Sequence, residues 1–204
     1  MKKSITLRYL VGSAMLGAVA FVLMFFDFSI PIMPSFIKMD FSDLPELIGA
    51  FAYGPFYGVL IAFIKNGLHL FRTSTMGIGE LSNFLLGSVF ALVAGLIYKK
   101  NRTFKGAIIG SIAGAFAMGI FSLLSNYVLV YPLYYNVLGF PEVAILGMYK
   151  AILPSTPNIF MALLIFNVPF TIVKGLFSVI ITLLIYKPLR PVLKMTFLDK
   201  KKDK

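Results

Sequence analysis

Four polar residues stand inside apolar stretches of this sequence, where they could hold a small molecule. An ammonium group, two carboxamides and a hydroxyl together donate and accept several hydrogen bonds. If these stretches cross a membrane, a charged lysine at the bilayer centre costs about 2.5–3.5 kcal/mol on insertion scales and normally faces protein or a cavity. We therefore expect an outward-opening ligand pocket lined by Lys174, Asn126, Asn83 and Thr171.

The same residues also have structural explanations. Lys174 could form an ion pair with Glu46 or Glu80, and the asparagines could hydrogen-bond one helix to another. Lys65 and His69 also lie in an apolar stretch, and they fit either explanation. The residue types alone leave both a pocket and a set of internal contacts open.

Composition places these residues in a membrane protein. Of the 204 residues, 59% are hydrophobic and only 13% are charged, and the mean hydropathy is +0.90. Soluble domains carry roughly 25% charged residues, and a soluble fold of this length could not bury so much apolar surface. The chain has no cysteine, a single histidine and no phosphate-binding loop motif. We therefore expect no disulfide, no metal site, no resident cofactor and no nucleotide hydrolysis of the Walker type.

The net charge of +11 fits membrane topology better than a nucleic-acid surface. Most of the 19 lysines and arginines lie at the N-terminus, in the 99–105 loop and in the C-terminal tail, whereas few lie in the other loops. Cytoplasmic loops of membrane proteins carry the excess of Lys and Arg. We therefore expect both termini in the cytoplasm and an even number of helices.

The apolar segments predict an all-α polytopic membrane protein, with one domain over residues 1–204 and six transmembrane helices in a compact bundle. A span needs about 20 residues, and fewer where the helix is broken. Proline lacks a backbone donor, so Tyr53-Gly54-Pro55 should separate two shorter segments that turn back at one face. The first helix has no signal cleavage site and should be retained. The expected helices cover about 7–26, 44–53, 56–71, 79–98, 104–131 and 160–186.

A long segment, 132–158, separates the last two expected helices. A connection of this length is usually a lid or a binding loop. Its middle, Glu142 to Leu153, predicts a short surface helix. Four tyrosines near its start should anchor the outer membrane interface, where amphipathic rings are common: Tyr127, Tyr131, Tyr134 and Tyr135.

Distance along the helices divides the bundle into two halves. At about 1.5 Å per residue from the basic clusters, Lys174, Asn83 and Asn126 lie roughly 20, 24 and 31 Å from the cytoplasmic side. Glu46 and Asn66 belong to segments that start from or return to the outer face. The polar residues therefore gather in the outer half.

Small residues predict close helix contacts in the inner half. The first helix carries Ala14-x-x-x-Ala18, beside Gly12 and Gly17, at about 9 Å from the cytoplasmic side. Such a motif lets two backbones approach, and packing inside the bundle is its commonest role. We assign a similar run on the fifth helix, Gly106, Gly110 and Gly114, to packing within the bundle.

Several segments, in order and at matching places in each helix, resemble the riboflavin-specific S-components of energy-coupling factor (ECF) vitamin transporters. Together with the six helices and the Ala-x-x-x-Ala motif, they extend the resemblance over most of the chain. The matching segments are Met39-Asp40-Phe41-Ser42-Asp43-Leu44-Pro45, Lys65-Asn66, Asn83-Phe84, Ser125-Asn126-Tyr127 and Pro169-Phe170-Thr171-Ile172-Val173-Lys174-Gly175.

The resemblance implies that the chain binds riboflavin as transported cargo. Asn126 and Lys174 match ligand-contacting residues of the family, whereas Thr171 stands where the family usually has asparagine, and Leu44 and Pro45 would close against the flavin ring. Ala14 and Ala18 would dock a transmembrane coupling subunit that two cytoplasmic ATPases drive. The implied ligand-binding residues are Leu44, Pro45, Glu46, Asn66, Asn83, Asn126, Thr171 and Lys174.

Three alternatives remain beside riboflavin capture. The first is an S-component for another vitamin, since the scaffold is shared. The second is an intramembrane enzyme with Lys174 or Glu46 as its base, although the sequence has no carboxylate dyad, HExxH motif or serine–lysine pair at a suitable spacing. The third is a scaffold protein, in which a buried lysine would serve only pairing.

Overall fold

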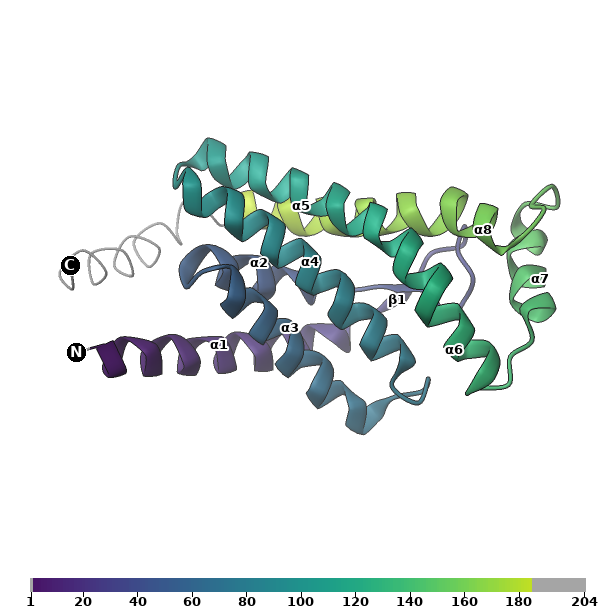
Figure 1. Cartoon of the computed structure of the whole chain (residues 1–204), viewed down its shortest axis with the longest axis horizontal. Helices are drawn as coiled ribbons and strands as arrows, with labels where there is room; N and C mark the ends of the chain where they lie inside the picture. Colours follow the sequence, from purple (N-terminus) through teal and green to yellow (C-terminus); the bar gives the residue numbers. More distant parts are fainter. Residues whose placement is uncertain (1, 185–204) are drawn as a thin grey trace.

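A computed structural model describes residues 2–184 of the chain, with side chains from residue 7 onward. The fold is all-α apart from one two-stranded ribbon, as expected from the sequence (Figure 1). Four helical stretches are long and apolar enough to cross a membrane: Leu7–Met24, Ile78–Lys100, Phe104–Asn136 and Ile159–Leu184. The chain is therefore an α-helical membrane protein.

Two shorter helices, α2 (Asp43–Ala52) and α3 (Pro55–His69), form a hairpin within the bundle. Gly54 between them has a φ of 124°, which an L side chain rarely adopts, and Pro55 occupies the first turn of α3. The predicted break at Tyr53-Gly54-Pro55 is thus confirmed. In Figure 1 this turn lies at the same end as the start of α1 (Lys2–Met24) and the turn after α4 (Ile78–Lys100).

The first loop, between α1 and α2, contains the antiparallel ribbon of β1 (Phe28–Ser29) and β2 (Lys38–Met39). A short 3₁₀ turn, η1 (Leu70–Arg72), follows α3. Both connections lie at the end of the molecule opposite the α2–α3 turn.

Helix α5 (Phe104–Ser125) packs closely along α4 because glycines line the contact. A Cβ on Gly110 or Gly114 would meet the carbonyl oxygens of Ala94 and Phe90. The assignment of these two glycines to packing within the bundle is confirmed. A Cβ on Gly106 would instead meet the carbonyl oxygen of Asn101, so Gly106 serves the α4–α5 turn.

Beyond α5 the chain keeps helical direction through a π-helical turn, η2 (Asn126–Val130), into α6 (Tyr131–Asn136). The predicted surface helix is present as α7 (Glu142–Ile152), and α8 (Ile159–Ala162) leads through a second π turn, η3 (Leu163–Asn167), into the last helical stretch. A separate apolar core joins α6, α7 and α8, including Tyr131, Tyr134, Ile145 and Tyr149.

Helix α1 presents two different faces. Gly12 and Gly17 face the bundle, where an added Cβ would meet Tyr53 and Ile64. Ala14 and Ala18 lie on an exposed face instead. Packing inside this chain, the commoner role of such a motif, therefore does not account for the alanine pair.

Some sequence-based bounds differ from the structure. The helix expected at 104–131 continues to Asn136, because Pro132 falls in the first turn of α6, where its missing donor is tolerated. The expected pair 44–53 and 56–71 is present as α2 and α3, both shorter than 18 residues. The end of the expected 160–186 helix, the basic tail and the side chains of Lys2 and Lys3 lie outside the described residues.

Candidate ligand-binding site

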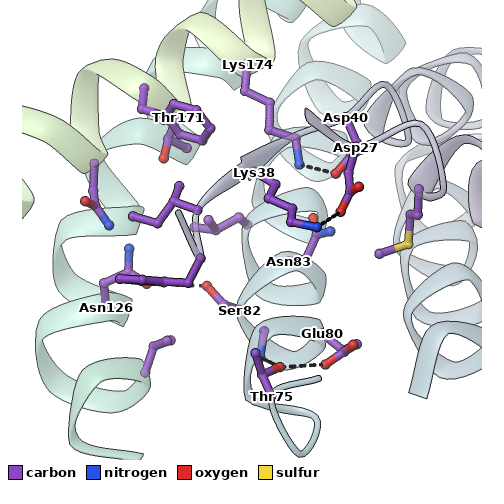
Figure 2. A pocket seen from close by; sticks show the side chains of 18 of the residues that line it. Asp27, Lys38, Asp40, Thr75, Glu80, Ser82, Asn83, Asn126, Thr171 and Lys174 are labelled. Carbon is purple, nitrogen blue, oxygen red and sulfur yellow. Dashed lines mark hydrogen bonds and ion pairs between the residues drawn. The ribbon is translucent and has the colours of Figure 1, made fainter. Parts of the chain in front are cut away.

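A cavity of about 280 Å³ opens among the ends of α1, α4, α5–α6 and the last helix, where the first loop meets the bundle (Figure 2). Its walls mix apolar and polar side chains. The apolar part includes Met24, Phe36, Ile37, Leu86, Met118, Val130 and Phe170. The polar part includes Asp27, Lys38, Asp40, Asp43, His69, Thr75, Glu80, Ser82, Asn83, Asn126, Asn167, Thr171 and Lys174.

The four residues on which the predicted pocket rested all line this cavity: Asn83, Asn126, Thr171 and Lys174. Figure 2 shows them on three different helices, pointing towards a common space. The side-chain oxygen of Asn126 accepts a hydrogen bond from the Ser82 hydroxyl at 3.3 Å, which links η2 to α4 at the wall. The sequence therefore identified residues that the fold brings together from distant parts of the chain.

The other four predicted site residues are not among the side chains that line the cavity. Leu44 and Pro45 lie in the first turn of α2, directly after Asp43, which does line it. Glu46 is fully buried behind that turn, and Asn66 is buried on α3, where its amide donates to the carbonyl oxygen of Ala62 at 2.8 Å. Glu46 and Asn66 therefore lie behind the wall.

Lys174 is paired with carboxylates of the first loop and α2. Its ammonium lies 3.1 Å from Asp40 Oδ2 and 3.6 Å from Asp43 Oδ2. Burial alone would raise the pKa of Asp40, but the ammonium groups of Lys174 and Lys65 outweigh it and lower that pKa to about 2. Lys174 therefore joins the last helix to the first loop across the cavity, and its partners are neither Glu46 nor Glu80.

Lys65 occupies the enclosed side of the same charge network. Its ammonium lies 2.6 Å from Glu46 Oε1 and 2.9 Å from Asp43 Oδ1, and it donates to the Ser42 hydroxyl at 2.7 Å. Asp43 therefore stands between the two lysines. Buried charges persist only when they are paired in this way.

The carboxylate of Glu46, which pairs with Lys65, lies directly against Gly87 of α4. A Cβ on Gly87 of α4 would collide with both carboxylate oxygens of Glu46. Gly87 is therefore needed for the close approach of α2 to α4 at this charge.

A second polar cluster lies around Glu80, at the start of α4. Glu80 Oε1 is 2.8 Å from His69 Nδ1, and Glu80 Oε2 accepts hydrogen bonds from Thr73 and Thr75 at 2.9 and 3.2 Å. These contacts close the α3–α4 connection at the cavity wall, where His69 is hydrogen-bonded to Glu80 and also lines the cavity.

Sequence reasoning missed several wall residues. Tyr131 and Tyr134 were expected to anchor the membrane interface, but both are buried and line the cavity, because α7 and the first loop cover them. Of the four tyrosines only Tyr127 is exposed, as an anchor would be. Asn167, also unassigned, lines the cavity one helical turn before Thr171, and this spacing from a predicted site residue was the signal available.

The chain matches known transport proteins over nearly its whole length. Residues 8–186 match the family model "ECF transporter, substrate-specific component". The riboflavin transporter RibU of Staphylococcus aureus (strain TCH60) is 34% identical over 187 residues, which cover 92% of this chain and 93% of RibU. The riboflavin transporter FmnP of Bacillus subtilis (strain 168) is 32% identical, with 90% of this chain and 93% of FmnP covered.

A solved structure agrees with the sequence comparisons. The S component of a bacterial ECF transporter superposes on this fold with a TM-score of 0.72 at 34% identity, covering 93% of this chain and 99% of that chain. All of these proteins are transport components, so the enzyme alternative is set aside. The chain belongs to the substrate-specific components of ECF transporters.

Proposed function

We propose that this chain captures riboflavin at its outer face and delivers it to an ATP-driven ECF transporter. The observation that carries the proposal is the cavity in which Asn83, Asn126, Thr171 and Lys174 converge. The relatives named as riboflavin transporters support this choice of cargo over another vitamin.

The chemistry of the cavity suits a flavin. The isoalloxazine ring is flat and amphipathic, and sites for such ligands combine apolar walls with a few placed polar groups. Leu86, Met118, Val130 and Phe170 supply the apolar part of this lining. The ribityl hydroxyls would satisfy amide groups and an ammonium that are costly to leave unpaired in an enclosed site.

Individual roles follow from position. Asn126 and Lys174 offer donors directly to the ligand, and Asn83 and Thr171 complete the polar lining. Leu44 and Pro45 begin α2 beside the cavity, so we assign them to closing it with the first loop. Glu46 and Asn66 act from behind the wall by holding α2 and α3 in place.

The topology that we propose has six membrane segments, with α2 and α3 as the second and third, in a single S-component domain over residues 1–204. Both termini then lie in the cytoplasm. Two observations support this orientation: the start of α1, the α2–α3 turn and the basic 99–105 loop share one end of the bundle, and the polar cavity occupies the other (Figure 1).

We further propose that Ala14 and Ala18 dock the transmembrane coupling subunit, which two cytoplasmic ATPase subunits drive. Both alanines are exposed on α1, so a partner helix can approach the backbone there. Ala14→Trp should abolish riboflavin uptake in cells that hold the complete transporter, while the purified variant still binds riboflavin. Ile120→Trp, on an exposed face of α5, is the matched control and should leave uptake intact. Loss of binding in Ala14→Trp would contradict a partner role.

The cargo is tested on the purified protein. Bound flavin colours a protein yellow, and added riboflavin should lose fluorescence when it enters the cavity. A colourless preparation that does not quench riboflavin would exclude this cargo. If another vitamin's own fluorescence is quenched on binding, or if a non-flavin vitamin displaces riboflavin, the other-vitamin alternative is favoured.

A further inference from the structure

Three buried polar side chains form a closed hydrogen-bonded ring at the outer wall of the cavity. Tyr149 of α7 donates its hydroxyl hydrogen to Asn167 Oδ1 at 2.6 Å, and Asn167 Nδ2 donates to the Tyr131 hydroxyl oxygen at 3.2 Å. The two tyrosine hydroxyls are also hydrogen-bonded to each other. All three side chains are buried, and Tyr149 is fully so.

The number of hydrogens fixes the direction of the ring. Each tyrosine hydroxyl carries one hydrogen, and that of Tyr149 already points to Asn167. Tyr131 must therefore donate to Tyr149, so each of the three groups donates once and accepts once. A carboxamide nitrogen carries two hydrogens, and the ring uses only one of those on Asn167. One N–H of Asn167 remains available.

Two members of the ring line the cavity, and the third lies behind them. Asn167 and Tyr131 line the cavity, whereas Tyr149 stands behind them and does not. Tyr149 holds Oδ1 of Asn167 on the side away from the cavity, and the amide can turn over only if both tyrosine hydroxyls reverse their hydrogen bonds at the same time. The remaining N–H is then presented to whatever occupies the cavity.

Both wall residues stand at π-helical turns. Asn167 is the last residue of η3, and Tyr131 directly follows η2. π turns in α-helices occur frequently at functional sites. Tyr149 hydrogen-bonds to both Asn167 of η3 and Tyr131 beside η2, so α7 is tied to two cavity-lining helices at once.

We propose that Asn167 is a further ligand-contacting residue, which donates its remaining N–H to an acceptor oxygen or nitrogen of the flavin. Tyr149 is a positioning residue that orients this amide through the ring. The proposal rests on the flavin-binding function proposed above. It gives α7 a task beyond covering the bundle, since a surface helix determines which atom of Asn167 faces the ligand.

The test is a double-mutant cycle on riboflavin affinity, measured by fluorescence quenching with purified full-length protein. Asn167→Ala removes the donor. Tyr149→Phe removes the hydroxyl group and keeps the packing of the aromatic side chain. Each should weaken riboflavin binding about 2- to 12-fold, the range for a neutral hydrogen bond. Because Tyr149 acts through Asn167, the double variant should bind about as weakly as Asn167→Ala alone.

The controls separate this proposal from a general loss of fold and from failure of the cargo assignment. Tyr135→Phe, a partly buried tyrosine of α6 outside the cavity lining, should bind riboflavin within about twofold of wild type. Tyr131→Phe breaks the same ring and replaces Tyr149→Phe in the cycle if the latter does not purify. Wild-type protein that does not bind riboflavin would overturn both proposals.

If wild type binds riboflavin, two results overturn the ring proposal alone. Unchanged affinity in Asn167→Ala would remove Asn167 from the ligand contacts. Additive losses in the double variant would show that Tyr149 acts on α7 packing and not through the amide. Equal, non-additive losses support the proposal.

Discussion

Lys65 and Lys174 belong to one network of buried charge, yet they stand in different surroundings. Lys65 is fully enclosed, with 0% of its side chain exposed and three partners within 2.9 Å. Lys174 keeps 11% of its side chain exposed to the cavity, and its carboxylate partners lie at 3.1 and 3.6 Å. Asp43 is shared by both.

The difference distinguishes a structural ion pair from the ligand-binding group that we propose. Every partner of Lys65 is buried protein, so its charge is compensated once the chain is folded. Lys174 has looser partners and an open side, where a ligand can replace or add to them. We therefore assign Lys65 to stability and propose a role in recognition for Lys174.

Loss of Lys65 should have the largest effect. Lys65→Met leaves Glu46 and Asp43 without their nearest positive charge inside the bundle, and breaking a buried pair typically costs about 3–5 kcal/mol. We expect a large fall in the thermal unfolding midpoint of the detergent-purified protein. A midpoint close to that of wild type would show that the network is not needed for folding.

Replacement of Lys174 should affect binding more than stability. Hydrogen bonds to charged groups contribute about 1.5–3 kcal/mol, so Lys174→Met should weaken riboflavin binding roughly 10- to 150-fold. The unfolding midpoint should fall less than in Lys65→Met, because Asp40 faces the cavity and water can solvate it. Lys150→Met, an exposed lysine of α7, is the control for a change of net charge.

The next effect concerns the glycine beside Glu46. Gly87→Ala places a methyl group against the Glu46 carboxylate, and overpacking of this kind costs about 1–3 kcal/mol. Thermal unfolding should show a lower midpoint. Gly147→Ala on α7 is the matched control, since an added Cβ there meets open space. Equal midpoints in the two variants would contradict the packing described for Glu46.

Asn126→Ala should give the smallest effect of the series. It removes one neutral amide from the cavity wall, which corresponds to about 0.5–1.5 kcal/mol of binding free energy. Quenching titrations should show riboflavin affinity reduced about 2- to 12-fold. Wild-type affinity would remove Asn126 from the ligand contacts.

Much of the helical frame follows from local sequence. Apolar runs give the long helices, and Gly54 with Pro55 gives the α2–α3 turn. The α4–α5 packing follows from Gly110 and Gly114. The convergence of Asn83, Asn126, Thr171 and Lys174 was also predicted, because depth in a bundle scales with distance along each helix.

The pairing of charges could not be predicted in the same way. Asp40 and Lys174 are 134 residues apart, and whether they meet depends on the path of the first loop. The π turns also shift the face of each helix that follows, so counting residues from the basic clusters does not show that Tyr131 points inward, and only the spacing from Thr171 indicates that Asn167 does. Their burial depends on α7, whose place against the bundle is a tertiary contact.

A fluorescence titration of riboflavin into wild-type protein and Lys174→Met, side by side, tests the central claim most directly. We predict saturable quenching with one ligand per wild-type chain, and a curve displaced to roughly 10- to 150-fold higher concentration in the variant. No quenching with wild type, or superimposable curves for the two proteins, would contradict the assignment of this cavity to riboflavin.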